Sequence, residues 1–256
     1  MIKTTKEKIE EIKNNGYQLD FGNVFNHAFE NYKKIALYAG LMIFVFSILI
    51  GILIAGIVIF TFGVSVLNEK SLENLKNENF SSAFMLVYII GAIVLSCLLS
   101  PFPAGLIKMA HCGEKDEEFH VSTILEYYKA PYFKELVIAT LLISLFSTGL
   151  SALVDYTEIK IVGSLISMTV SFFTFLTIPL IIFGDLKAFD AIKSSMIIVS
   201  KQPLVLLGLV IVSIIASMVG FIGCCIGIFF TIPFMYSMYY AIYVAIIGID
   251  SENEFE

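Results

Sequence analysis

Five stretches without any charged residue constrain the fold of this chain more than any other feature. They contain no Asp, Glu, Lys or Arg and cover residues 35–67, 81–107, 136–154, 161–184 and 202–249. An α-helix rises about 1.5 Å per residue, so about 20 apolar residues cross a hydrocarbon core about 30 Å thick. The composition agrees, because 58% of the residues are hydrophobic, against roughly 45–50% in a soluble domain. The sequence therefore predicts a multi-pass membrane protein.

The last stretch is too long for one crossing, and a break is expected at Gly220-Phe221-Ile222-Gly223, where glycines make a tight turn inexpensive. The predicted fold is thus all-α, an integral membrane bundle of six transmembrane helices. The membrane domain covers residues 21–249, after a polar segment (1–20) and before an acidic tail (250–256). The expected spans are 35–62, 83–106, 136–154, 161–183, 204–221 and 224–248.

Lysine positions orient these spans. With an even number of crossings, both termini share a side with the loops 107–135 and 184–203. That side carries every lysine except Lys70, Lys76 and Lys160. Because positive charge accumulates on the cytoplasmic side, we expect both termini in the cytoplasm. The expected location is a bacterial-type plasma (inner) membrane.

One order of four features occurs three times along the chain. The four are an amphipathic segment, a span, a short outer turn and a second span with proline near its end. The amphipathic segments are 21–33, 119–130 and 186–200, each with apolar residues at three- and four-residue steps. In the third, these apolar residues are Phe189, Ile192, Met196 and Val199. We interpret the pattern as three repeats of an amphipathic helix plus a transmembrane hairpin.

Prolines mark the closing half of each repeat, in Leu99-Ser100-Pro101, Thr177-Ile178-Pro179 and Thr231-Ile232-Pro233. A proline in a span removes a backbone hydrogen bond that a neighbouring hydroxyl or water must replace. A kinked helix could line a cavity, and a packed bend is the alternative. The candidate kink or cavity residues are Pro101, Thr177, Pro179, Thr231, Pro233 and Tyr236, the last from a tyrosine stripe that either packs or lines a ligand path.

Several chemistries are disfavoured by the residues present. The net charge of −6 and the absence of arginine argue against nucleic-acid binding. No ionisable residue lies within a predicted span, which disfavours an ion-coupled carrier. The loop His111 to His120 has metal-capable residues but lacks the close Cys or His pairs of structural zinc sites, so neither a metal nor a cofactor is expected. Small residues four apart, such as Gly51/Ala55 and Gly163/Ser167, suit close helix packing within the chain or in a homodimer.

The third repeat shows a family resemblance. Its elements are Asp190-Ala191-Ile192-Lys193, Lys201-Gln202-Pro203 and Thr231-Ile232-Pro233, followed by the tyrosines from Tyr236 to Tyr243. This pattern resembles a broad group of bacterial six-span proteins that includes the membrane domain attached to some glycerophosphodiester phosphodiesterases. The resemblance covers most of the chain and implies a helical membrane fold and a link to lipids or the envelope. It supplies no catalytic residue.

The sequence favours a non-enzymatic membrane component that interacts with lipid, or with a membrane-protein partner, through its amphipathic helices. The alternative is a carrier or channel for a small apolar or amphiphilic solute. A membrane enzyme ranks third and would depend on His27, His111 and His120, which are all the histidines in the chain.

The lysine distribution generates a test of topology. Reporter tags at the two termini should both be accessible from the cytoplasm, and a tag in segment 63–81 should be accessible only from outside. Tag-accessibility mapping in intact and permeabilised cells measures this. Termini on opposite faces would contradict the six-span assignment.

Overall fold

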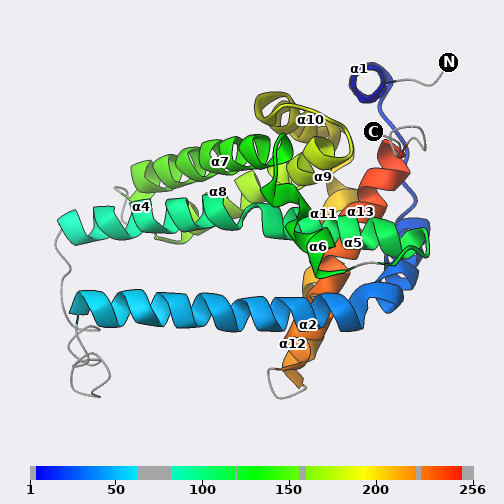
Figure 1. Cartoon of the computed structure of the whole chain (residues 1–256). Coiled ribbons are helices and arrows are strands. Elements are labelled where there is room, and N and C mark those ends of the chain that lie inside the picture. The colour runs from blue at the N-terminus through cyan, green and yellow to red at the C-terminus, as the bar shows by residue number, and fades with distance from the viewer. Residues whose placement is uncertain (1–3, 63–81, 119, 156–159, 223–225, 250–256) are drawn as a thin grey trace.

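The computed structural model describes residues 4–62, 82–118, 120–155, 160–222 and 226–249, and the regular elements within these ranges are helices (Figure 1). They are α1 (Thr5–Asn15), α2 (Phe21–Phe62), α4 (Ser82–Leu99), α5 (Pro101–Glu114), α6 (Val121–Leu125), η2 (Glu126–Tyr128), α7 (Tyr132–Asp155), α8 (Lys160–Thr174), α9 (Thr177–Ile182), α10 (Ala188–Lys201), α11 (Pro203–Met218), η3 (Val219–Ile222), α12 (Gly227–Thr231) and α13 (Pro233–Ile246). The predicted acidic tail 250–256, Gly223 and the pair Cys224-Cys225 lie outside the described residues.

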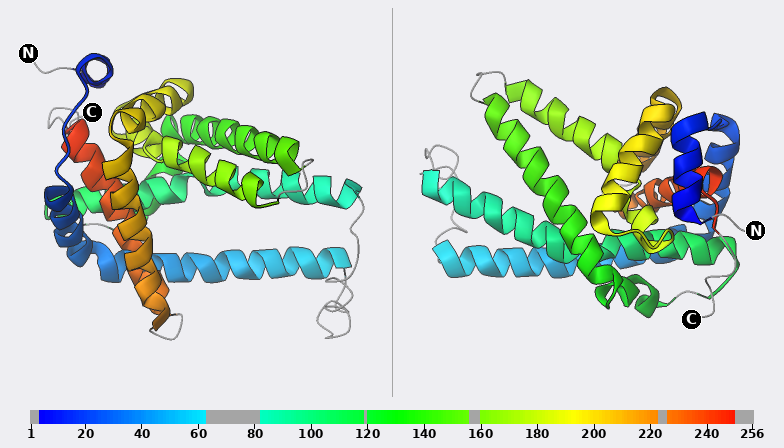
Figure 2. Two further views of the ribbon diagram at one scale, coloured as in Figure 1. Left: turned by 180° about the vertical axis from the view of Figure 1, so that it is seen from behind. Right: turned by 90° about the horizontal axis from the view of Figure 1, so that it is seen from above.

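Six segments are long and apolar enough to cross a membrane, which confirms the predicted all-α, multi-pass fold. They are Phe21–Phe60, Leu86–Glu114, Tyr132–Ser151, Val162–Ile182, Pro203–Ile222 and Gly227–Ile246. The first is longer than expected, because segment 21–33 continues into its span as one helix of 42 residues. At 1.5 Å per residue α2 is about 60 Å long, twice the thickness of a hydrocarbon core. Its first part turns away from the rest, as Figures 1 and 2 show.

Three of the spans are interrupted beside a proline within them. Pro101 and Pro233 are the first residues of α5 and α13, and each follows a one-residue break after the preceding helix. Pro179 lies in the short helix α9, which a two-residue break separates from α8. Proline lacks an N–H group and its ring clashes with the preceding turn, so a helix is most easily restarted with proline in its first turn.

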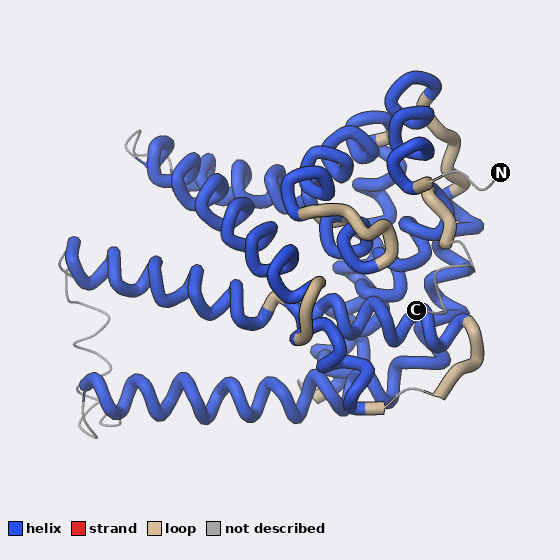
Figure 3. Tube along the Cα trace, turned by 45° about the horizontal axis from the view of Figure 1, so that its top comes forward, coloured by secondary structure: helices blue, strands red, loops and turns tan. Residues whose placement is uncertain are grey.

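The buried core lies at one end of the molecule, the end at which the described chain begins and finishes (Figures 1 and 3). Helices α2, α5, α6, α9, α10 and α13 meet there, and their fully buried side chains include Ile35, Met109, Ile124, Leu180, Ile198 and Tyr240. Toward the other end the helices separate and apolar side chains are exposed, with Ile52 at 65% and Phe60 at 94%. In a membrane protein these side chains face lipid, where apolar exposure costs nothing.

The hairpin of α7 and α8 is held together by serines as well as by apolar contacts. The Ser151 hydroxyl donates to the Gly163 carbonyl at 3.1 Å and lies 2.9 Å from the Ser167 hydroxyl. Ser147 donates to Ser167 at 3.2 Å. Small and hydroxyl residues of this kind allow helices to approach closely and bond to each other within lipid. Gly163 and Ser167 therefore pack within the chain, as one of the two sequence interpretations predicted.

The third hairpin, α11 with α12 and α13, crosses the long straight part of α2 (Figure 2), whereas α13 packs against the first part of α2 through Phe234, which contacts Phe25 and Tyr32. Its two arms are joined by Thr231, whose hydroxyl donates to the Ser217 carbonyl at 2.6 Å. Gly220 lies in η3, and a methyl group there would come within 2.5 Å of the Ile228 Cα. Gly220 is thus required for the close approach of the two arms, whereas the sequence suggested that it would form the turn itself.

Helices α2, α6, η2 and α10 cover most of the three segments predicted to be amphipathic, but the apolar residues do not all lie on one side. In α10, Val199 is fully buried, whereas Phe189 and Met196 are 71% and 48% exposed. The same division separates Ala28 from Phe29 in α2, and Ile124 from Leu125 in α6. Each segment has one apolar side in the core and a second one open. The triplication of one unit stays a prediction.

The contact between α5 and α6 generates a stability prediction. A methyl group at Gly105 would overlap the carbonyl of Ile124 and lie 2.6 Å from its Cα, whereas one at Gly91 in α4 would meet nothing within 4 Å. Gly105→Ala should destabilise the protein by about 1–3 kcal/mol, because the backbone of α6 must shift. Gly91→Ala is the matched control and should be neutral or slightly stabilising. The measurement is the midpoint of thermal unfolding in detergent; equal midpoints would disprove the close contact.

Candidate functional site: the open face of α10

Helix α10 is held at its start by side chains of α7. The Glu135 carboxylate accepts a hydrogen bond from the Ala188 N–H at 2.8 Å. This bond satisfies one of the free N–H groups at a helix start, where a negative charge is also favourable. Just before the helix, the Tyr132 hydroxyl donates to the Asp185 carboxylate at 2.9 Å. Two contacts from one helix thus fix where α10 begins.

The end of α10 is held by the segment between α1 and α2. The Gln202 amide donates to the Tyr17 carbonyl at 2.7 Å and accepts from the Leu19 N–H at 3.2 Å. The Tyr17 hydroxyl donates to the Ile198 carbonyl at 3.1 Å. Burial raises the pKa of Tyr17, so this hydroxyl stays a donor across the physiological pH range. Helix α10 is therefore fixed at both ends.

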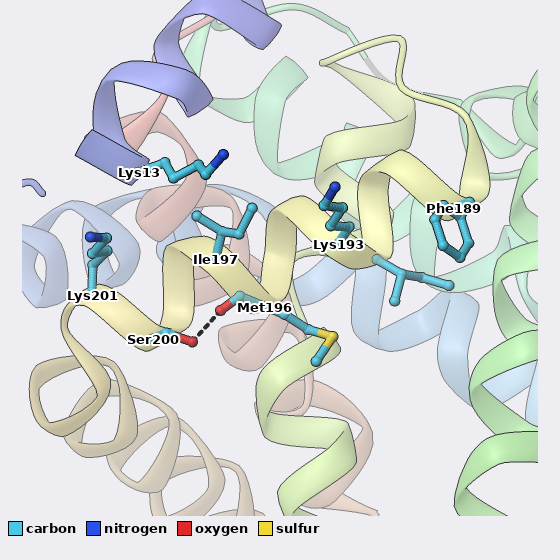
Figure 4. Close-up of a pocket in the computed structure, with 8 residues that line it drawn as sticks. Lys13, Phe189, Lys193, Met196, Ile197, Ser200 and Lys201 are labelled. Carbon is cyan, nitrogen blue, oxygen red and sulfur yellow. Dashed lines mark hydrogen bonds between the residues drawn. The ribbon is translucent and has the colours of Figure 1, made fainter. Parts of the chain in front are cut away.

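One face of α10 forms a groove of about 500 Å³ (Figure 4). Its residues recur at three- and four-residue steps, so they form one continuous stripe. The lining comprises Lys13 of α1 with Phe189, Ile192, Lys193, Met196, Ile197, Ser200 and Lys201 of α10. Figure 4 shows the three lysines along one side of the helix and Phe189 and Met196 toward the other. The groove is thus amphipathic across its width.

A second groove, of about 490 Å³, continues from the first across Phe189, Ile192 and Met196, which line both. Its other walls come from α7 (Leu142, Ile143 and Phe146) and α8 (Thr169, Val170, Phe173 and Thr174). The hydroxyls of Thr169 and Thr174 donate to carbonyls of their own helix, Leu165 and Val170, both at 2.8 Å. The second groove therefore offers an apolar surface with no free donor on its threonines.

The lysines of the first groove differ in their ion pairing. Lys13 lies 3.8 Å from the Glu10 carboxylate, and Lys6 nearby lies 3.8 Å from Asp190. Within the described ranges, Lys193 and Lys201 form no ion pair. The groove therefore has two lysines without an ion pair on one side, next to an apolar surface that leads between two spans.

A separate network of polar groups, buried at Asn31, His111 and Ser237, joins α2, α5 and α13. The Asn31 amide donates to the Ala110 carbonyl at 2.5 Å and accepts from the Ser237 hydroxyl at 2.9 Å. His111 Nδ1 lies 2.9 Å from the Tyr240 hydroxyl, and His27 Nε2 lies 2.8 Å from the Glu114 carboxylate. His27 and His111 thus join helices, and sequence reasoning, which considered them for catalysis, missed this role.

The six candidate residues from the sequence lie elsewhere. Pro101, Pro179 and Pro233 are buried at the helix breaks, and none of the six lines either groove. Neither threonine is seen to replace a bond lost at proline: Thr231 donates to the Ser217 carbonyl of α11, and the buried Thr177 hydroxyl has no hydrogen-bond partner among the described residues. Tyr236 packs edge-on against Tyr239, with ring centroids 6.4 Å apart. The structure does not bring these residues together into one site.

The comparisons with known proteins add no identification: no family model, no curated protein and no solved structure matches the chain. Among the described residues, no three His, Cys, Asp or Glu side chains cluster in a way that could hold a metal ion. The open face of α10 is the strongest candidate site. The spacing of Phe189, Lys193, Met196 and Lys201 was the sequence signal that could have found it.

The buried network generates a second stability prediction. Asn31→Ala should lower the free energy of unfolding by about 1–3 kcal/mol, because the Ala110 carbonyl and the Ser237 hydroxyl lose their partner. Asn26→Ala, an exposed asparagine of the same helix, is the matched control and should change it by less than about 0.5 kcal/mol. Denaturant titration in detergent micelles measures both. Equal effects would show that the network contributes no stability.

Proposed function

We propose that this chain is a non-enzymatic, multi-pass component of a bacterial-type plasma membrane that binds membrane lipid through the open face of α10. One observation carries the proposal: a helix fixed at both ends presents the exposed side chains of Phe189 and Met196 beside unpaired lysines, at the mouth of a crevice between two spans. Apolar surface beside cationic side chains is the arrangement that a membrane interface favours.

Two sequence features support this assignment. The lysine distribution predicts that α10 and both termini lie on the cytoplasmic side, where lysines attract the anionic lipid surface. The resemblance to the membrane domain of glycerophosphodiester phosphodiesterases also agrees with a link to lipids. A homodimer or a membrane-protein partner is a further part of the proposal, because Gly51 and Ala55 of α2 are exposed and a methyl group at Gly51 would meet nothing within 4 Å.

A carrier of small amphiphilic solutes is the second candidate, and a third cavity favours it. This cavity, of about 350 Å³, lies between α4, α7 and α8, two of which lead to proline breaks. Hydroxyl groups from all three helices line it, namely Ser96, Ser144, Ser147, Thr148 and Ser171. Transport of an added amphiphile into liposomes that contain the purified protein would favour this candidate over a lipid-binding component.

Lipid retention tests the proposed function. Replacing Phe189 and Met196 together by alanine should weaken lipid retention about tenfold, because the exposed apolar contact is removed. Met218→Ala with Phe221→Ala is the matched control, since these side chains are also about half exposed, at 55% and 52%, but line neither groove. Native mass spectrometry of the detergent-purified protein measures the bound lipid. An equal loss in both double variants would indicate general lipid contact and contradict a site on α10.

A further inference from the structure

We infer that the two grooves on α10 form one site for an anionic phospholipid, with the phosphate beside Lys193 and Lys201 and an acyl chain in the crevice between α7, α8 and α10. This inference rests on the proposed function and adds to it the chemical class and the orientation of the ligand. The shared residues Phe189, Ile192 and Met196 make the two grooves continuous.

The lysines set the preference for a negative headgroup. Lys193 and Lys201 are eight positions apart, which is about 12 Å along a helix, and Ile197 lies midway between them. Lys13 approaches the same place from α1 (Figure 4). A phosphate above Ile197 is therefore within reach of long, flexible ammonium side chains from both sides. The cationic groups of zwitterionic lipids would be repelled by the same lysines.

The hydroxyl in the groove does not favour a neutral sugar headgroup. The Ser200 hydroxyl already donates to the Met196 carbonyl at 2.6 Å, as the dashed line in Figure 4 shows. Its oxygen can still accept a bond, but the donors left for a ligand in this groove are ammonium groups. Ammonium groups bind phosphate more strongly than uncharged hydroxyls.

The second groove fits an acyl chain and not a peptide. Peptide N–H and C=O groups in an apolar crevice need partners, and leaving them unpaired costs several kcal/mol in hydrocarbon. The threonines in this groove already bond to their own helices, and the remaining lining residues are apolar. An acyl chain needs no partner. The crevice lies along α7 and α8, the helices of the third and fourth spans, so a lipid could enter it from the bilayer.

The test compares two lipids on the full-length protein. Native mass spectrometry titrations in detergent use phosphatidylglycerol as the anionic probe and phosphatidylcholine as the zwitterionic one. The wild-type protein should prefer phosphatidylglycerol. Lys193→Gln with Lys201→Gln should lower phosphatidylglycerol affinity about tenfold and leave phosphatidylcholine unchanged, because each lysine near an anionic headgroup contributes a severalfold attraction.

Two further variants distinguish the contribution of the headgroup to binding from that of the acyl chain. Lys129→Gln with Lys134→Gln removes the same charge from exposed lysines outside both grooves and should keep the preference. Val170→Trp should fill the second groove and weaken the binding of both lipids about equally. Each variant is first checked for a wild-type unfolding midpoint, and an unstable Val170→Trp is replaced by Val170→Phe.

The outcomes distinguish this inference from the proposed function. The inference is overturned if the Lys193/Lys201 variant still prefers phosphatidylglycerol, or if the Lys129/Lys134 variant loses as much affinity for phosphatidylglycerol as the Lys193/Lys201 variant. It is also overturned if filling the second groove leaves the affinity for both lipids unchanged. The proposed function fails separately, if the wild-type protein retains neither lipid above the level of the detergent background.

Discussion

Backbone hydrogen bonding inside hydrocarbon is the constraint on which the rest of this structure depends. No water reaches the acyl-chain region, so each N–H and C=O group there needs a partner within the protein. The six spans meet this demand as helices, and proline interrupts three of them at the breaks before α5, within the α8–α9 pair and before α13. At the last break the neighbouring Thr231 bonds to α11, so one hydroxyl also joins two arms of a hairpin.

Packing is concentrated at one end of the molecule. Apolar side chains gain nothing by leaving lipid for each other, so the outer parts of α2 separate from their neighbours without cost. At the end that holds the termini, the buried apolar side chains gather into one core. The core and the network around Asn31, His111 and Tyr240 are both found there. This end is therefore the rigid part that positions α10.

The proposed lipid site follows from the double role of α10. Its inner side, including Ala191 and Ile198, belongs to the core, and Glu135 and Gln202 fix its two ends. Its outer side forms grooves with α1, α7 and α8, in which Phe189 and Met196 stay exposed. A rigid helix with an uncovered apolar stripe and unpaired lysines is pre-organised for an amphiphile, because little ordering is needed when the ligand binds.

The sequence by itself determined the fold class, the number of spans and the positions of the helix breaks, because charge-free length and proline are local properties. It also indicated the helical periodicity of α10. Only the tertiary structure decided which residues of that helix stay open: Val199, expected on the same face as Phe189 and Met196, is buried by the core. The partners of Asn31 and Gly105 were likewise decided by tertiary contacts with residues distant in the chain. Periodicity specifies that a helix has faces, but which face is covered depends on the neighbours that the fold brings to it.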